Sequence, residues 1–111
     1  MQDRFKFRAW DSIAKEYIFD SYALYELFVN DIDNSYQVEQ CTGLTDKNGK
    51  LIYEGDIVEV PVLYNEIPTG KKQRCKVYYK HGAFNIYAVK SEYLKVIGNI
   101  HENPELLEDN K

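Results

Sequence analysis

The chain has few of the residues that would assign it to a class at once. Its 111 residues include two cysteines, three prolines and one methionine, and no apolar run approaches the roughly 18 residues that span a membrane. Its start lacks the apolar region of a signal peptide, so export is not expected. Because Cys41 and Cys75 are far apart and form no C-x-x-C motif, we expect two reduced, buried thiols in a reducing cytoplasm.

The composition is that of one ordinary globular domain over residues 1–111. Hydrophobic residues make up 44% and charged residues 29%, which argues against disorder, and ten tyrosines favour strands. The net charge of −4 argues against generic binding to nucleic acids or anionic membranes, because phosphate contacts need a positive field. A local basic stripe remains compatible with it.

Alternating apolar and polar side chains predict three strands in the first part of the chain. These are residues 5–10, 16–19 and 36–41. The first two are expected to pair as a hairpin around a turn at Asp11-Ser12. The stretch 22–29 stays open: a helical stripe competes with a strand beginning at Leu27. The stripe consists of Ala23, Leu24, Leu27 and Phe28. Residues 31–35 are polar and turn-like.

A tight turn and a regular strand define the centre of the chain. Asn48-Gly49 is the dipeptide best able to adopt the positive φ angles of such a turn. Residues 51–53 then form a strand, and Glu54-Gly55 is a second break. The strand after this break places valines on one face, namely Val58, Val60 and Val62. Pro61 cannot donate to a ladder, so the strand is an edge there or ends there, and residues 63–70 are expected to form a loop.

A further hairpin is predicted around a two-residue turn at His81-Gly82, since His is tolerated at positive φ. In that register Lys80 faces Ala83, and the pairing continues to Cys75 opposite Ala88. One face collects Cys75, Val77, Tyr79, Phe84, Ile86 and Ala88. The other collects Lys76, Tyr78, Lys80, Asn85 and Tyr87. A slip by one residue would destroy this sorting, so the buried face fixes the register.

The last part of the chain contains a predicted strand over residues 93–97, a break at Gly98-Asn99 and a short helix. Asn103 would cap that helix, and Pro104 suits its first position. We therefore predict a mainly β fold with a small SH3-like or barrel-like antiparallel sheet and a short C-terminal helix. Within it, residues 1–41 supply N-terminal strands that pack on the barrel-like part, residues 42–111.

Four stretches, in order along the chain, resemble the YopX family of small proteins encoded in bacteriophages and prophages of Gram-positive bacteria. They are Lys6–Asp11, Cys41–Lys50, Ile52–Val58 and Val96–Leu106. The resemblance implies a mostly β protein of phage origin that works in the bacterial cytoplasm and forms homo-oligomers. It implies no catalytic residues. Residues 12–36 and 63–72 match no specific motif of the family.

Candidate chemical sites fail on spacing. Asp46, Asn48 and Gly49 with Glu54 suggest a calcium loop, but the glycine is fourth instead of sixth and the glutamate ninth instead of twelfth. Residues 31–34 lack the required glycine. A zinc set lacks ligand pairs at knuckle spacing; its members would be Cys41, Cys75, His81 and His101. Burial of Cys75 would raise its pKa and leave it unreactive. We therefore expect no metal, no cofactor and no enzyme activity.

One stretch of the chain concentrates basic and aromatic residues, and we predict an interaction surface there. Its members are Lys71, Lys72, Arg74, Lys76, Tyr78, Lys80 and Tyr87. Basic residues beside aromatics on a sheet hold single-stranded nucleic acids in some folds. The alternative, favoured by the overall charge, is that lysines keep a strand edge soluble. Outward tyrosines are also typical of protein interfaces.

Three functions follow from these observations, in order of preference. The first is a non-enzymatic phage accessory protein, a protein-binding or self-assembling module whose partner is a second copy or a host or phage protein. The second is a nucleic-acid-binding module that uses residues 71–80. The third is an enzyme with an unrecognised site. No membrane partner is expected.

Overall fold

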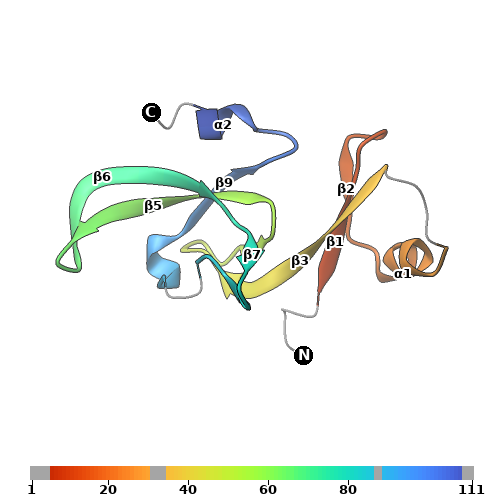
Figure 1. The fold of residues 1–111 in the computed structure, drawn as a ribbon, viewed down its shortest axis with the longest axis horizontal. Coiled ribbons are helices and arrows are strands. Elements are labelled where there is room, and N and C mark those ends of the chain that lie inside the picture. Colours follow the sequence, from red (N-terminus) through yellow and green to blue (C-terminus); the bar gives the residue numbers. More distant parts are fainter. Residues whose placement is uncertain (1–5, 31–34, 87–88, 109–111) are drawn as a thin grey trace.

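A computed structural model describes residues 6–30, 35–86 and 89–108 of the chain. The fold is mainly β, a curled antiparallel half-barrel with short helices, which confirms the predicted fold class (Figure 1). The elements are β1 (Phe7–Asp11), β2 (Glu16–Ile18), α1 (Ser21–Asn30), β3 (Tyr36–Thr45), β4 (Leu51–Tyr53), β5 (Asp56–Tyr64), β6 (Ile67–Lys76), β7 (Tyr79–Lys80), β8 (Ala83–Phe84), the 3₁₀ turn η2 (Ser91–Tyr93), β9 (Lys95–Asn99) and α2 (Glu105–Glu108).

The strands form three antiparallel groups. Their orders are β2-β1-β3-β4, β6-β5-β9 and β7-β8. The predicted N-terminal hairpin is confirmed, with Trp10 opposite Tyr17, and Asp11 Oδ1 accepts the N–H groups of Ile13 and Ala14 in its turn. Strand β3 pairs with β1 at its start and with β4 at its end. It therefore runs without interruption across residues 41 and 42, where the two predicted parts of the domain meet.

Residues 22–29, for which a helix and a strand were both considered, belong to the helix α1. The alternative of a strand beginning at Leu27 is therefore wrong. Asp20 caps the helix, since its Oδ1 accepts the N–H groups of Tyr22 at 2.8 Å and Ala23 at 3.0 Å. Leu24 of the apolar stripe is buried. The cap and the stripe together favour the helix. Of the polar stretch that follows, residues 31–34 lie outside the described residues.

The predicted loop over residues 63–70 is wrong, because β5 and β6 form a long hairpin there. They pair from Ile57 opposite Lys76 to Tyr64 opposite Ile67, and the turn consists of two residues at positive φ, Asn65 at 51° and Glu66 at 67°. This is a type I′ turn, in which Asn is favoured and which suits the twist of a hairpin. The proline and glycine that indicated a loop lie within β6.

The outer part of this hairpin extends beyond the three-stranded sheet. Strand β9 pairs with β5 only from Asp56 to Glu59, so among the described strands β5 has an open edge on that side at Pro61, as predicted. We call residues 60–73 the arm. In Figure 1 the arm forms one end of the molecule and α1 lies at the other.

The predicted register of the next hairpin is confirmed only beside its turn. Further from the turn the predicted pairing is wrong, because Cys75 and Lys76 pair with β5 and Val77 bonds to Gly55 and Asp56 instead of lying opposite Ile86. Tyr79 lies opposite Phe84, and the turn residues His81 and Gly82 both have positive φ, 56° and 84°. The predicted burial of Tyr79 is also wrong, since Tyr79 is 53% exposed, although its ring packs edge-on against Phe84. The hairpin is short and Tyr79 extends past the edge of the core. The predicted partners Tyr87 and Ala88 lie outside the described residues.

The core lies where the sheets meet. Its buried members are Ile52, Val58, Val77, Ile86 and Leu94. Next to it, β9 differs from the prediction: Tyr93 belongs to η2, and the strand includes Gly98 and Asn99. Only glycine fits at position 98 of this strand, because a Cβ there would lie 2.5 Å from Asn103 Oδ1.

The predicted C-terminal helix is present as α2, directly after Pro104. The side chain of Asn103 has a different use from the predicted cap, since its Oδ1 accepts the N–H of Asn99 at 3.2 Å. It therefore holds the turn after β9 closed.

Candidate functional site

The predicted interaction surface lies mainly along β6 and β7. Lys71, Lys72, Lys76, Tyr78 and Lys80 are exposed, Arg74 is half-buried and Tyr87 lies outside the described residues. Two of the cations have partners within the chain. Lys72 Nζ lies 3.6 Å from Glu59 Oε1, and Arg74 Nη1 donates to the carbonyl of Leu106 at 3.2 Å. The described members thus follow one another along β6, the short connection after it and β7, and their role in binding stays a prediction.

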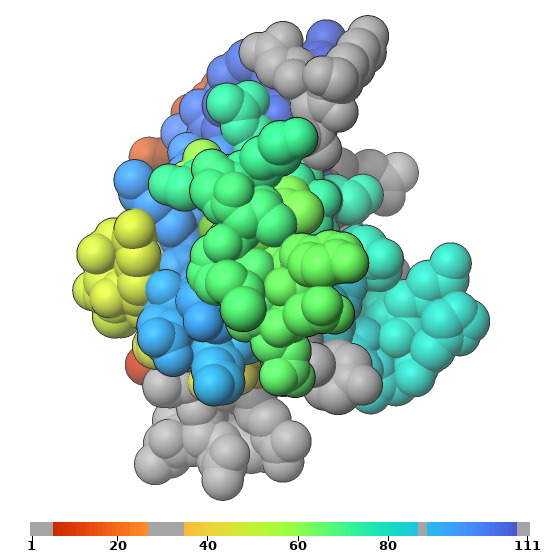
Figure 2. Space-filling view, turned by 90° about the vertical axis from the view of Figure 1, so that its left-hand side faces the viewer, coloured from red at the N-terminus to blue at the C-terminus, as the bar shows by residue number. Residues whose placement is uncertain are grey.

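The arm carries exposed apolar side chains that the sequence reasoning missed. At its tip, Leu63 is 44%, Tyr64 73% and Ile67 66% exposed. Figure 2 looks onto this end of the molecule, with the green surface of the arm foremost. The signal was the run Val62-Leu63-Tyr64 of strand-favouring residues after Pro61, followed by Asn65, a residue that tolerates positive φ.

A second exposed aromatic group lies at the other end of the molecule. Phe19, Tyr22 and Tyr25 are 58%, 71% and 61% exposed. We call these three residues the α1 face. Tyr22 and Tyr25 are three positions apart and so lie on one side of the helix. Phe19 packs edge-on against Tyr53, with 6.0 Å between the ring centroids.

A buried polar cluster around Arg8 joins the N-terminal strands to the rest of the fold. Arg8 Nε donates to Glu39 Oε1 and Arg8 Nη2 to Asp56 Oδ1, both at 2.8 Å. Arg8 Nη2 also reaches the carbonyl of Glu54 at 3.1 Å. On the other side of Glu39, His101 Nε2 lies 2.8 Å from Oε2. The cluster thus ties β1, β3, β5 and the segment after β9 together.

Aromatic rings enclose this cluster. The Arg8 guanidinium lies 4.0 Å from the centroid of the Tyr17 ring and 4.6 Å from that of Tyr53. His101 stacks on Trp10, with centroids 4.8 Å apart and an angle of 6° between the planes. Tyr17 also donates its hydroxyl to Glu39 Oε1 at 3.2 Å.

The opposite charges of the cluster stabilise one another. Burial by itself lowers the pKa of Arg8, but the carboxylates of Asp56 and Glu39 outweigh this effect. The pKa is therefore raised and the guanidinium stays charged. Burial raises the pKa of Asp56, and the Arg8 cation and the Tyr53 N–H offset this only in part. Burial likewise raises the pKa of the Tyr17 hydroxyl. Because both carboxylates are used to hold Arg8, the geometry fits a structural clamp.

Gly55 is required beside this clamp for two reasons. Its φ is +85°, and a Cβ at this position would lie 2.5 Å from Glu39 Oε2. Arg8, Gly55, Asp56 and His101 all come from the stretches that carry the family resemblance. Three of the four stretches therefore meet at the clamp, whereas the whole arm lies outside them.

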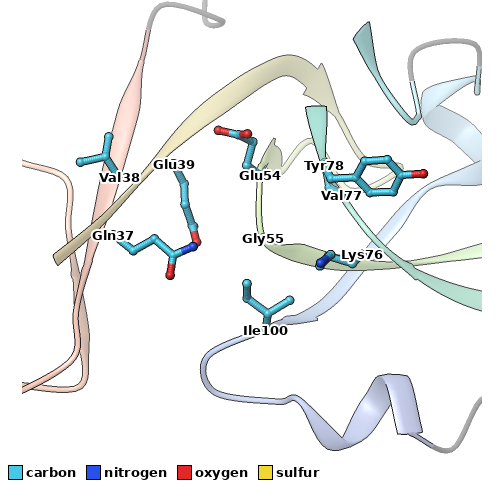
Figure 3. Close-up of a pocket in the computed structure, with 9 residues that line it drawn as sticks. All are labelled: Gln37, Val38, Glu39, Glu54, Gly55, Lys76, Val77, Tyr78 and Ile100. Atoms are coloured by element: carbon cyan, nitrogen blue, oxygen red, sulfur yellow. The ribbon is translucent and has the colours of Figure 1, made fainter. Parts of the chain in front are cut away.

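The described residues line two hollows on either side of the clamp. The larger, about 350 Å³, has mixed walls that include Arg8, Phe19, Lys50, Ile97 and Glu102. The smaller, about 160 Å³, lies between β3 and the chain around Val77; Figure 3 shows Gln37 and Glu39 reaching into it from β3. Only the larger has the size of an ordinary small-molecule site, and its opposite charges favour no single ligand class.

The cysteines and histidines that could form a zinc set lie in separate environments. Cys41 is buried and its Sγ accepts the N–H of Gly43 at 3.4 Å, whereas half-buried Cys75 packs against the core. Burial raises the pKa of the Cys75 thiol, as expected. His81 lies in an exposed turn and His101 in the clamp. Within the described ranges, no group of three potential metal ligands is found.

In the turn after β3, the carboxylate of Asp46 accepts several backbone N–H groups. Asp46 accepts the N–H groups of Asn48, Lys50 and Val96 at 2.9 to 3.0 Å. Burial by itself raises the pKa of Asp46, but these three bonds lower it below its usual value. Asp46 therefore fixes the turn to the start of β9.

Comparisons with known proteins agree with this architecture. The crystal structure of protein EF1440 from Enterococcus faecalis has a TM-score of 0.64 and 30% identity to this chain, over 92% of this chain and 96% of that one. No curated protein matches the chain. No described helix is long and apolar enough to cross a membrane. A family model described as YopX protein matches residues 24–108, so the chain belongs to the YopX family.

Proposed function

We propose that the chain is a non-enzymatic accessory protein of a bacteriophage or prophage that assembles with copies of itself in the cytoplasm of the bacterial host. The observation that carries this proposal is the arm, whose tip exposes Leu63, Tyr64 and Ile67. Membership of the YopX family is consistent with an accessory role.

A bound partner would stabilise the arm. A two-stranded ribbon on its own is only marginally stable in water, and beyond Glu59 the arm has no third strand among the described residues. Its apolar tip residues would lose contact with water on binding, which contributes about 25 cal/mol for each Å² of apolar surface covered. The same surface in a strictly monomeric protein promotes aggregation.

A second copy is the partner that we favour. The chain has a net charge of −4, whereas its strands β6 and β7 are basic. The acidic remainder of a second copy therefore offers the opposite charge to β6 and β7. Large exposed aromatic side chains are also present on the same chain, in the α1 face. Aromatic residues are enriched at such interfaces.

Light scattering on a gel-filtration column tests self-assembly. The wild-type chain is expected to elute as a multimer, and the arm variant Leu63→Ser, Tyr64→Ser, Ile67→Ser as a monomer. Val38→Ser is the control, because Val38 is an exposed apolar residue of β3, outside the arm and the residues that lead into α1, and its loss should leave the multimer intact. A monomeric wild-type chain would rule out the proposal.

A nucleic-acid-binding module is the second candidate, favoured by one observation. Lys71, Lys76 and Lys80 are exposed near the exposed ring of Tyr78, a combination that suits a single strand. Filter binding of single-stranded DNA at low and high salt separates the two functions. Binding that falls steeply with salt would favour this candidate, and absent or salt-independent binding would remove it.

A further inference from the structure

The two exposed aromatic or apolar surfaces of the chain lie at opposite ends. The arm forms one end of the long axis and α1 the other (Figure 1). One copy cannot bring its own arm to its own α1 face across this distance. Contact between the two surfaces therefore requires two copies.

The strands that flank the two surfaces differ in the sign of their charge. Residues 67–80, which run from the arm through β6 to β7, contain five basic residues and no acidic one; Lys71 and Lys72 lie in the arm, whose turn also carries Glu66. Residues 11–26, which lead into α1, contain four acidic residues and one lysine. Opposite charges around two apolar patches favour their contact and fix its orientation.

A symmetric contact between two arms fits these charges less well. Strand β6 lies at the edge of its sheet among the described strands, so two copies could pair through it around a two-fold axis. That pairing would set Lys71, Lys72 and Arg74 of one copy close to the same residues of the other. Like charges on paired strands are destabilising.

We propose that the arm of one copy docks on the α1 face of the next copy, in a head-to-tail assembly. Leu63, Tyr64 and Ile67 would pack against Tyr22 and Tyr25, with the basic side chains of β6 beside the carboxylates that lead into α1. A head-to-tail contact uses different surfaces on the two copies, so it produces a ring or a filament rather than a two-fold dimer. This inference rests on the proposed self-assembly.

A mixing experiment tests the arrangement. The arm variant (Leu63→Ser, Tyr64→Ser, Ile67→Ser) keeps an intact α1 face, and the face variant (Tyr22→Ser, Tyr25→Ser) keeps an intact arm. Each is expected to be monomeric alone, and an equimolar mixture is expected to form a complex of one chain of each. A symmetric arm-to-arm contact predicts instead that the face variant assembles like the wild type and that mixing forms no such complex.

The outcomes separate the two proposals. A monomeric wild-type chain contradicts self-assembly itself. A multimeric wild-type chain with a multimeric face variant, or with no complex on mixing, overturns the head-to-tail arrangement alone. A second variant, Lys71→Glu with Lys76→Glu, keeps the apolar tip and should weaken the assembly by about tenfold or more at low salt. An unchanged assembly would contradict the role of charge.

Discussion

Arg8 holds together segments that are distant in the sequence. Its partners Glu39 and Asp56 are 31 and 48 positions away, and His101 is 62 positions from Glu39. No local pattern predicts such contacts, so the sequence reasoning placed Arg8 on a strand without identifying its role. By contrast, the positive φ at His81 was predictable, because it depends on residue type and on a two-residue turn.

Replacing Arg8 tests the clamp. Arg8→Met is expected to lower the free energy of unfolding by about 3–5 kcal/mol, because Glu39 and Asp56 would remain buried without a cation. Lys90→Met, at an exposed position outside the predicted interaction surface, is the control and should change the free energy by less than about 0.5 kcal/mol. Urea unfolding measures both. Similar small losses for the two variants would show that Arg8 is not a clamp.

A pair of glycine variants separates backbone strain from steric conflict. Gly49→Ala and Gly55→Ala both place alanine at positive φ, which costs about 1–2 kcal/mol. Only at Gly55 does the new Cβ meet Glu39; at Gly49 nothing lies within 4 Å. We expect Gly55→Ala to be destabilised by at least about 3 kcal/mol in urea unfolding. Equal losses in the two variants would contradict the steric argument.

At the scale of elements, the hairpins were predicted where a turn residue and a sorted face agreed. The register at His81-Gly82 is an example, because a shift would have placed charged residues on the face of Val77. The arm was missed because Pro68 and Gly70 outweighed the strand-favouring residues before the turn, Val62, Leu63 and Tyr64. Both residues are tolerated in an edge strand, and the edge position of β6 arises only from the tertiary fold.

The turn of the arm offers a stabilising change. Glu66 has a φ of 67°, a conformation that glycine adopts without strain, so Glu66→Gly should stabilise the arm by about 0.5–1 kcal/mol. Slower amide hydrogen exchange within residues 60–73 is the measurement. Glu66→Ala is the matched control, because it removes the same carboxylate and keeps the backbone strain. If exchange is equally slow in both variants, the stabilisation comes from removal of the carboxylate and not from relief of backbone strain.

The turn held by Asp46 predicts a dependence of stability on pH. Because its pKa is lowered on folding, Asp46 stabilises the fold above its unfolded pKa of about 3.9, and this contribution is lost as the pH falls through the folded pKa. Asp46→Asn should cost about 1–3 kcal/mol at pH 7. Urea unfolding at several pH values should show this difference shrinking below about pH 4. A difference independent of pH would contradict the charged role of Asp46.

At the scale of the whole molecule, composition and the family resemblance were sufficient for the mainly β class. They could not place the arm and α1 at opposite ends, since this arrangement depends on how the sheets curl around the core. Two members of the predicted basic surface, Lys71 and Lys72, lie in the arm, close in the chain to apolar side chains that had been assigned to a loop. The basic residues and the exposed apolar residues together favour assembly.

The mass of the wild-type chain in solution, measured by light scattering over a range of concentrations, tests this account most directly. We predict a species several times the 13.1 kDa of one chain, which the arm variant reduces to a single chain. A wild-type mass that stays at one chain up to the highest concentration reached would contradict self-assembly through the arm.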